Sequence, residues 1–183
     1  MKPYLFISLA ALLATSACKK DEIDALPKAT QEGKNTAGCL VNGEGFVAAE
    51  SGGSLLSNPT PALAGGFYED SLYYLTLAGK TSRGKTRIRL FFRSQSPGTY
   101  LFNQTTPNLD RAGLRYTLGY AACEFSDTKE FYITNAQHTG QVVLTRADLS
   151  RGITAGTFEF TAASTFDPRK TITVTKGRFD RRQ

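Results

Sequence analysis

The chain of 183 residues contains one His, no Trp and three Cys. A single His leaves few side chains that transfer protons near neutral pH, which argues against general acid–base catalysis by histidine. No C-x-x-C or H-x-x-x-H spacing occurs, which argues against a zinc site. The hydrophobic content of 40% and the absence of a collagen repeat exclude a fully disordered or collagenous chain. We therefore expect one folded domain without a metal or other cofactor.

Long apolar runs are also scarce. The notable one, Tyr4–Ala17, has 14 residues and follows Lys2, whereas a helix needs about 20 to span a bilayer. A basic start, a short apolar stretch and a small-residue exit are typical of a secretory signal peptide. We predict a signal peptide at residues 1–17 and no transmembrane helix after it.

The residues around Cys18 permit two kinds of cleavage. Thr15-Ser16-Ala17 would suit an ordinary signal peptidase, which would release a secreted protein. Together with Cys18 the segment also resembles the lipobox of bacterial lipoproteins, although Leu is usual where Thr15 stands. Lipidation of Cys18 would leave Cys39 and Cys123, which tend to pair in an oxidising compartment. We predict a lipid on Cys18 and a Cys39–Cys123 disulfide; the alternative for the latter pair is two buried free thiols.

Residues 18–38 are polar, contain Pro27 and show no sustained period of 2 or 3.6. This composition predicts a flexible tether that follows the lipidated Cys18. Its start, Lys20-Asp21-Glu22, resembles the acidic export signal of Bacteroidetes surface lipoproteins; a merely solubilising linker is the alternative. We expect an outer-membrane lipoprotein, either exposed at the cell surface or facing the periplasm.

Residues 39–183 alternate apolar and polar side chains between Gly, Pro, Asn and Asp, which predicts β-strands. Asn42-Gly43, between apolar flanks, is a strong hairpin signal. Further strands are expected at residues 66–68, 72–78, 86–93, 99–102, 114–120, 130–134, 141–146, 157–162 and 171–175. About nine or ten strands joined by short turns predict a single all-β domain, an antiparallel β-sandwich or a partly closed barrel.

Motifs at both ends of this domain resemble those of a Bacteroidetes lipoprotein family of unknown function. The opening motif is GKNTAGCLVNG (33–43), and the closing motifs are GTFEF (156–160) and GRFD (177–180). The resemblance implies a lipid anchor, a location in the Gram-negative envelope and an all-β domain. It brings no catalytic or binding residues with it.

A literal G-x-x-x-x-G-K-T string occurs at residues 79–86, GKTSRGKT. A phosphate-binding loop needs a helix N-terminus after it, but the residues that follow, Arg87–Arg93, alternate as a strand does. We therefore interpret the string as a basic hairpin loop and expect no nucleotide ligand.

Other candidate catalytic groups lack their usual context. His138 lies in a turn-like stretch without a nucleophile motif, so we expect an exposed loop His. Acid pairs for glycoside hydrolysis could come from the scattered carboxylates Asp110, Asp127, Glu130 and Asp148. A secreted hydrolase acting on glycans is thus the alternative to a protein that is not an enzyme.

Positive charge is concentrated in two segments. Residues 80–93 hold six basic and no acidic residues, and residues 169–182 hold six basic residues against Asp180 alone. Solvated strand faces and guarded sheet edges are the plain interpretation. The alternative is a polyanion-binding surface made by Lys85, Arg87, Arg89, Lys176 and Arg178, provided that the two strands lie close together.

We therefore expect a lipid-anchored envelope protein, a non-catalytic binding or surface-coat module. Its membrane contact would be the N-terminal lipid. Its ligand could be an acidic polysaccharide or the phosphates of lipopolysaccharide, whereas nucleic acid is not expected in that compartment.

Overall fold

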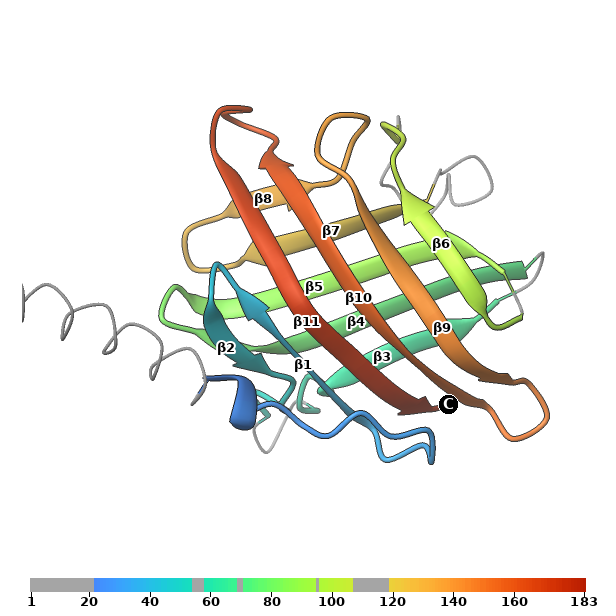
Figure 1. Ribbon diagram of the computed structural model, residues 1–183. Coiled ribbons are helices and arrows are strands. Elements are labelled where there is room, and N and C mark those ends of the chain that lie inside the picture. Colours follow the sequence, from blue (N-terminus) through green and yellow to red (C-terminus); the bar gives the residue numbers. More distant parts are fainter. Residues whose placement is uncertain (1–21, 54–57, 69–70, 95, 107–118) are drawn as a thin grey trace, which may run out of the picture.

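Eleven β-strands make up most of the described chain, so the all-β prediction is confirmed. The computed structural model describes residues 22–53, 58–68, 71–94, 96–106 and 119–183 (Figure 1). The predicted signal peptide and Cys18 lie outside the described residues. Within those ranges no helix has the length and apolar character needed to cross a membrane.

In chain order the strands are β1 (Thr36–Val41), β2 (Glu44–Val47), β3 (Leu63–Phe67), β4 (Leu72–Thr81), β5 (Gly84–Arg93), β6 (Gly98–Phe102), β7 (Tyr120–Phe125), β8 (Glu130–Ile133), β9 (Gly140–Asp148), β10 (Ile153–Ser164) and β11 (Thr171–Arg182). The predicted β1–β2 hairpin turns at Asn42-Gly43, where both residues have positive φ, 50° and 87°. This is the backbone geometry for which an Asn-Gly pair is suited.

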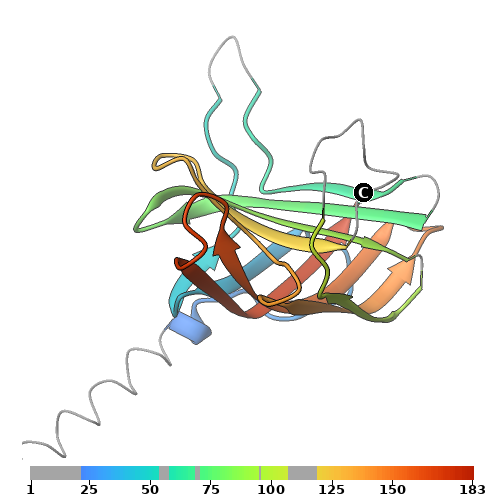
Figure 2. The ribbon, with the colours of Figure 1, turned by 90° about the horizontal axis from the view of Figure 1, so that it is seen from above.

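Nine strands follow one another in the order β2-β1-β11-β10-β8-β7-β5-β4-β3 and curl into an antiparallel half-barrel. The sheet forks at β10. Residues 153–160 of β10 pair with β9, which in turn pairs with β6, whereas Ala163 and Ser164 pair with β8. Strands β1, β11, β10, β9 and β6 therefore form a front layer that crosses a back layer of β8, β7, β5, β4 and β3 (Figures 1 and 2).

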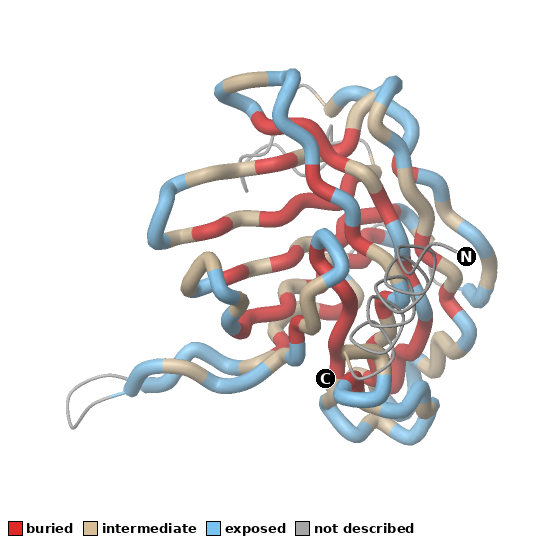
Figure 3. Tube along the Cα trace, turned by 60° about the vertical axis from the view of Figure 1, so that its left-hand side comes forward, coloured by how far each residue is buried: buried red, intermediate tan, exposed pale blue. Residues whose placement is uncertain are grey.

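The hydrophobic core fills the space between these layers. On β5 the alternate residues Ile88, Leu90 and Phe92 are buried in it, while Arg87 and Arg89 point to the opposite face. On β11 Phe179 is buried in the same core. Figure 3 shows this alternation as short buried segments along each strand. Because each layer is buried on its inner face, the outer faces are where a functional site could form.

The predicted disulfide is absent. Cys39 on β1 and Cys123 on β7 are both buried and both free. The two strands are not neighbours in the sheet, and both side chains belong to the hydrophobic core, where they act as small apolar residues. Burial raises the pKa of both thiols, that of Cys123 to about 12. The alternative of two buried free thiols is the one that the structure has.

Strand β7 was not predicted. Its sequence, YAACEF, is buried on both faces at most positions, so polarity does not alternate along it. The outward face of its neighbourhood carries a second apolar cluster, made by Leu72, Phe91, Tyr120 and Ala122. The strand expected at residues 114–120 falls largely outside the described residues.

Candidate binding groove

The residues just before β1 lie against the outer face of the front layer; we call residues 26–35 the strap. Leu26 is buried, and a Cβ on Gly38 would approach the Pro27 ring to 2.8 Å, so the start of the strap packs directly on β1. In Figure 1 this segment runs across the lower ends of β1 and β11. The sequence predicts a flexible tether here, yet from Glu22 onward the chain contacts the domain, since the Glu22 carboxylate accepts a hydrogen bond from the Gly45 N–H at 2.7 Å.

Asp180 on β11 holds the middle of the strap. Its carboxylate accepts hydrogen bonds from the Thr30 hydroxyl at 2.5 Å and from the backbone N–H groups of Glu32, Gly33 and Lys34 at 2.7–3.2 Å. Asp180 is 1% exposed. Burial raises the pKa of this carboxyl, but the hydrogen bonds outweigh burial, and the pKa is lowered overall.

Two residues with positive φ form the turn that leads the strap back to β1. Gly33 has φ +76°, and a side chain there would collide with Arg182. Asn35 also has positive φ, 56°, and its side-chain oxygen accepts a hydrogen bond from the Arg182 N–H at 2.9 Å. Gly and Asn are the residues that tolerate this left-handed conformation. The opening motif therefore encodes a turn that brings the strap back to the end of β11.

A β-bulge interrupts β11 beside the strap. Opposite the single residue Cys39 of β1, β11 places two residues, Lys176 and Gly177. The pairing of β11 with β10 shifts at the same level. Lys176 has φ 54°, and a Cβ on Gly177 would meet the Phe158 carbonyl oxygen at 2.5 Å. Bulges re-aim side chains and bend a strand, and this one turns Lys176 to the outer face.

Two adjoining hollows lie on this outer face, over β9, β10 and β11; together we call them the groove. The first has a volume of about 330 Å³ and is lined by Ala29 of the strap, Gln141, Val143, Thr157, Phe158, Glu159, Lys176, Gly177 and Arg178. The second has about 340 Å³ and is lined by Thr139, Gly140, Gln141, Glu159, Phe160, Thr161, Thr173, Val174 and Thr175. Because Gln141 and Glu159 line both hollows, the groove is continuous along β10.

The two cations of the groove carry no ion pair among the described residues. Lys176 is exposed and Arg178 is half-buried, and the guanidinium of Arg178 contacts only the Lys176 carbonyl oxygen, at 3.4 Å. The one carboxylate of the groove, Glu159, instead accepts a hydrogen bond from the Gln141 amide at 3.0 Å. The groove therefore presents two positive charges, Arg178 toward the strap and Lys176 on the bulge opposite Glu159, among neutral hydrogen-bonding groups.

Two cations of β5 share one carboxylate. Arg87 and Arg89 both contact the Glu124 carboxylate on β7, at 3.5 and 2.6 Å. Lys85 is exposed and, with Arg87, lines a third hollow of about 290 Å³ under the residues after β2. Lys85, Arg87 and Arg89 lie on the outer face of the back layer, whereas Lys176 and Arg178 lie on the outer face of the front layer. The structure therefore does not bring the two predicted basic segments into one surface.

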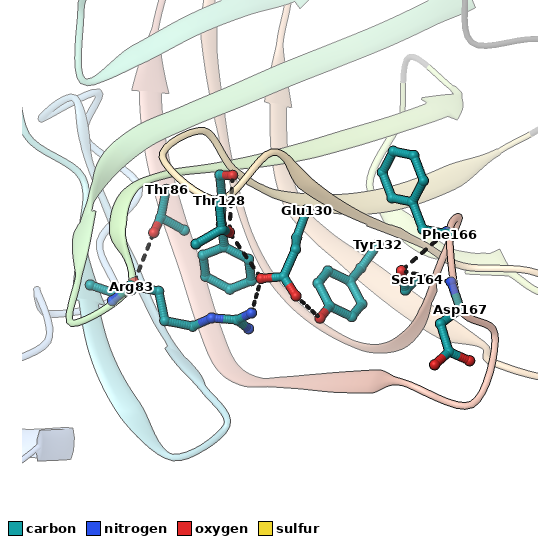
Figure 4. A network of polar contacts seen from close by, with 10 residues as sticks. Arg83, Thr86, Thr128, Glu130, Tyr132, Ser164, Phe166 and Asp167 are labelled. Atoms are coloured by element: carbon teal, nitrogen blue, oxygen red, sulfur yellow. Dashed lines mark hydrogen bonds and ion pairs between the residues drawn. The ribbon is translucent and has the colours of Figure 1, made fainter.

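The GKTSRGKT string forms the turn of the β4–β5 hairpin, with Thr81 opposite Gly84, and a strand follows it instead of a helix. Its Arg83 lies over the Phe125 ring at 3.9 Å and forms an ion pair with Glu130. The other oxygen of Glu130 accepts a hydrogen bond from the Tyr132 hydroxyl at 3.2 Å (Figure 4). In this network the Arg83 guanidinium and the Glu130 carboxylate are already paired with each other.

Two of the carboxylates predicted for hydrolysis, Asp148 and Glu130, have lowered pKa values. Hydrogen bonds from Arg146, Ser150 and the Arg151 N–H lower the pKa of Asp148 to about 2. The hydrogen bond from Thr128 and the nearby Arg83 lower the pKa of Glu130. Asp127 accepts the Lys85 N–H at 3.1 Å, and Asp110 lies outside the described residues. A glycosidase general acid needs the reverse, a raised pKa.

His138 and the metal-ligating residue types form no site in the described part of the chain. His138 lies in the loop between β8 and β9, where its ring contacts Asn135 of the same turn at 3.3 Å. Across the described ranges no group of three His, Cys, Asp or Glu side chains is arranged to hold a metal ion.

The groove contains residues that the sequence did not single out. Gln141, Glu159 and the outer threonines come together only through the register of the three consecutive strands β9, β10 and β11. The closing motif GRFD did contain one signal, because Asp180 is the only acid among the cations of residues 169–182. By strand alternation it belongs on a solvent face beside Arg178, but the strap buries it.

Comparison with known proteins gives one match. The model of a domain of unknown function, DUF6252, matches residues 68–181, from the residue after β3 to the last residue but one of β11. The match includes both closing motifs and the groove strands, whereas the opening motif and the strap lie before it. No curated protein and no solved structure matches the chain.

Proposed function

The chain belongs to the DUF6252 family, and because that family has no assigned function, we propose from the structure that the β-domain is a non-catalytic binding module. The observation that carries the proposal is the groove, where unpaired Lys176 and Arg178 stand beside hydrogen-bonding side chains. Hollows of a few hundred Å³ with a few convergent polar groups are the usual form of a binding site.

We further propose that a lipid on Cys18 anchors this module in the outer membrane of a Gram-negative envelope, at the cell surface. The lipobox-like segment before Cys18 and the resemblance of the opening and closing motifs to Bacteroidetes lipoproteins support the proposal. Glu22 already contacts Gly45 of the β1–β2 hairpin, so residues 19–21 alone separate Cys18 from the domain. Four extended steps of the chain span at most about 14 Å, and the domain would sit close to the membrane.

The anchor is tested by Cys18→Ser. The wild-type protein is expected in the detergent-extracted membrane fraction, with an N-terminal mass that includes acyl chains. The variant is expected as an uncleaved precursor or as released protein. A wild-type mature N-terminus at Cys18 without added mass would contradict the lipid anchor.

The binding role is tested with detergent-extracted full-length protein on a support, incubated with fractionated envelope extract. A saturable retained component, unchanged in size after incubation, is expected. Release of new reducing ends from a glycan fraction would instead indicate a hydrolase. If every fraction passes without saturable retention, the binding proposal fails whatever the result for the anchor.

A further inference from the structure

We propose that the groove binds a carboxylate-bearing polysaccharide, an inference that rests on the proposed binding function and names its ligand class. The structure offers two basic surfaces, and only one of them places two cations without an ion pair in the described residues beside a hollow lined by neutral hydrogen-bonding groups, since on the other Arg87 and Arg89 pair with Glu124 and leave Lys85 alone. That one is the groove on β9, β10 and β11, with Lys176 and Arg178 in its first hollow.

The charge of the groove favours an anion. A ligand carboxylate at Lys176 and Arg178 would displace no carboxylate of the protein, because neither cation forms an ion pair among the described residues. On β5 the same ligand would compete with Glu124, which already contacts Arg87 and Arg89. An Arg guanidinium matches a carboxylate in a two-bond geometry, and hydrogen bonds between charged groups are the stronger kind.

The rest of the groove favours hydroxyl groups. The Glu159 carboxylate uses one oxygen for the Gln141 amide, so its other oxygen can accept from a ligand hydroxyl. Around this pair stand outward-facing threonines, each able to donate and accept: Thr139, Thr157, Thr161, Thr173 and Thr175. A sugar acid supplies the carboxylate for the two cations and hydroxyl groups for the remainder.

The length of the groove favours a polymer over a single sugar. Along β10 its lining runs from Thr157 to Thr161, roughly 13 Å at the rise of a β-strand. The strap, through Ala29, bounds one end, and the second hollow continues away from it. A chain of linked sugars would lie along β10 with a carboxylate toward Lys176.

Glu159 also argues against a phosphate surface. A lipopolysaccharide or phospholipid headgroup carries dense negative charge, which the Glu159 carboxylate in the middle of the groove would repel. A carboxylated polysaccharide has neutral hydroxyl groups between its carboxylates, so it can place one carboxylate at Lys176 and Arg178 and a hydroxyl at Glu159. The observations therefore favour the carboxylated polymer.

The test measures binding of polygalacturonate to the full-length protein in detergent at low and physiological salt. Lys176→Gln/Arg178→Gln is expected to weaken binding by about tenfold or more, because two charge-assisted contacts are lost. The matched control Lys85→Gln/Arg87→Gln removes the same charge from the back layer and is expected to change the affinity less than about twofold. Thermal unfolding of both variants checks that each remains folded.

Four results would overturn the inference. They are equal weakening by the two double variants, an unchanged affinity in Lys176→Gln/Arg178→Gln, equal binding of a neutral dextran, or stronger binding of phosphatidylglycerol vesicles than of polygalacturonate. Each of these leaves the binding role itself to the envelope-extract experiment, which uses no acidic probe. The two failures are thus distinguishable.

Discussion

The two basic regions of this protein are each organised by one carboxylate, but the carboxylates have different partners. On the back layer Glu124 receives the side chains of Arg87 and Arg89. On the front layer Asp180 receives a hydroxyl and three backbone N–H groups of the strap. The carboxylate of Asp180 therefore binds the strap, and the nearby cations Lys176 and Arg178 form no ion pair among the described residues.

This difference shows that the density of Lys and Arg along a sequence does not determine the charge that a surface presents. Residues 80–93 contain no acid, yet Arg87 and Arg89 are paired with an acid from a neighbouring strand. Residues 169–182 contain one acid, yet that acid faces backbone donors. The charge of the surface depends on the register between strands, because the register determines which residue lies beside each cation.

The largest expected effect comes from Asp180→Asn. The carboxylate is buried and accepts several hydrogen bonds, and an amide cannot satisfy the same set of donors. We expect the free energy of unfolding to fall by about 3 kcal/mol, measured by urea denaturation at neutral pH. Glu124→Gln is the matched control, and its half-buried ion pairs, which remain open to solvent, should contribute less than about 1 kcal/mol. Similar losses in both variants would remove the distinction between the two carboxylates.

Low pH should also destabilise the front layer, as Asp180→Asn does. Folding lowers the pKa of Asp180, so the stability that it contributes is fully present above the unfolded value, about 3.9. That stability is lost as pH falls below this value toward the folded pKa, because the unfolded state then binds the extra proton. Between pH 5 and 3 the wild type should lose more unfolding free energy than Asp180→Asn does. Parallel losses in the two proteins would assign acid sensitivity to other carboxylates.

The alkylation rates of the two buried thiols measure local opening of the front layer, at Cys39, and of the back layer, at Cys123. Cys39 lies opposite the β11 bulge, and Cys123 lies opposite Ile88 of β5. Releasing the strap in Asp180→Asn should open β1 locally and speed alkylation of Cys39 by about tenfold, with little change at Cys123. Mass spectrometry of the alkylated peptides measures both rates. A disulfide in the isolated protein, or equal acceleration at both thiols, would contradict this expectation.

The smallest effect is expected for a substitution that gives the back layer free cations like those of the groove. Glu124→Gln should free Arg87 and Arg89 and make the back layer resemble the groove in charge. On an acidic-glycan column we expect this variant to elute at higher salt than the wild type, because screened surface charges dominate such retention. The folded stability should change by less than about 1 kcal/mol. An unchanged elution position would mean that Glu124 does not mask these cations.

The parts of the fold that the sequence predicted are those encoded locally. Alternation at Phe158 and Phe160 and the Asn42-Gly43 turn each depend on neighbouring residues, and the structure confirms both. The strand β7 escaped prediction because burial on both faces removes the alternation. A disulfide was predicted from cysteine count and compartment, neither of which carries information about the strands on which the thiols lie.

Which cations stay without an ion pair could not be predicted, because that depends on contacts between distant parts of the chain. On the back layer Arg87 meets Glu124 through the pairing of β5 with β7. Lys176 reaches the outer face through a bulge that appears only when β11 is aligned with β1 and β10. The strap looked like a tether because its stabilising partner, Asp180, is 150 residues from Thr30 in the chain.

That separation has a consequence for the order in which the protein can fold. The strap and β1 lie at the start of the domain in the chain, and their partners on β11 lie at its end, so they also arrive first and last during the proposed export. Until residues 174–182 arrive, β1 has no β11 to pair with, and the strap has no carboxylate to bind it. Contacts between distant parts of a chain are slow to form, since a large loop must close first. Completion of the front layer, and with it of the groove, is therefore expected to be the final and slowest step of folding.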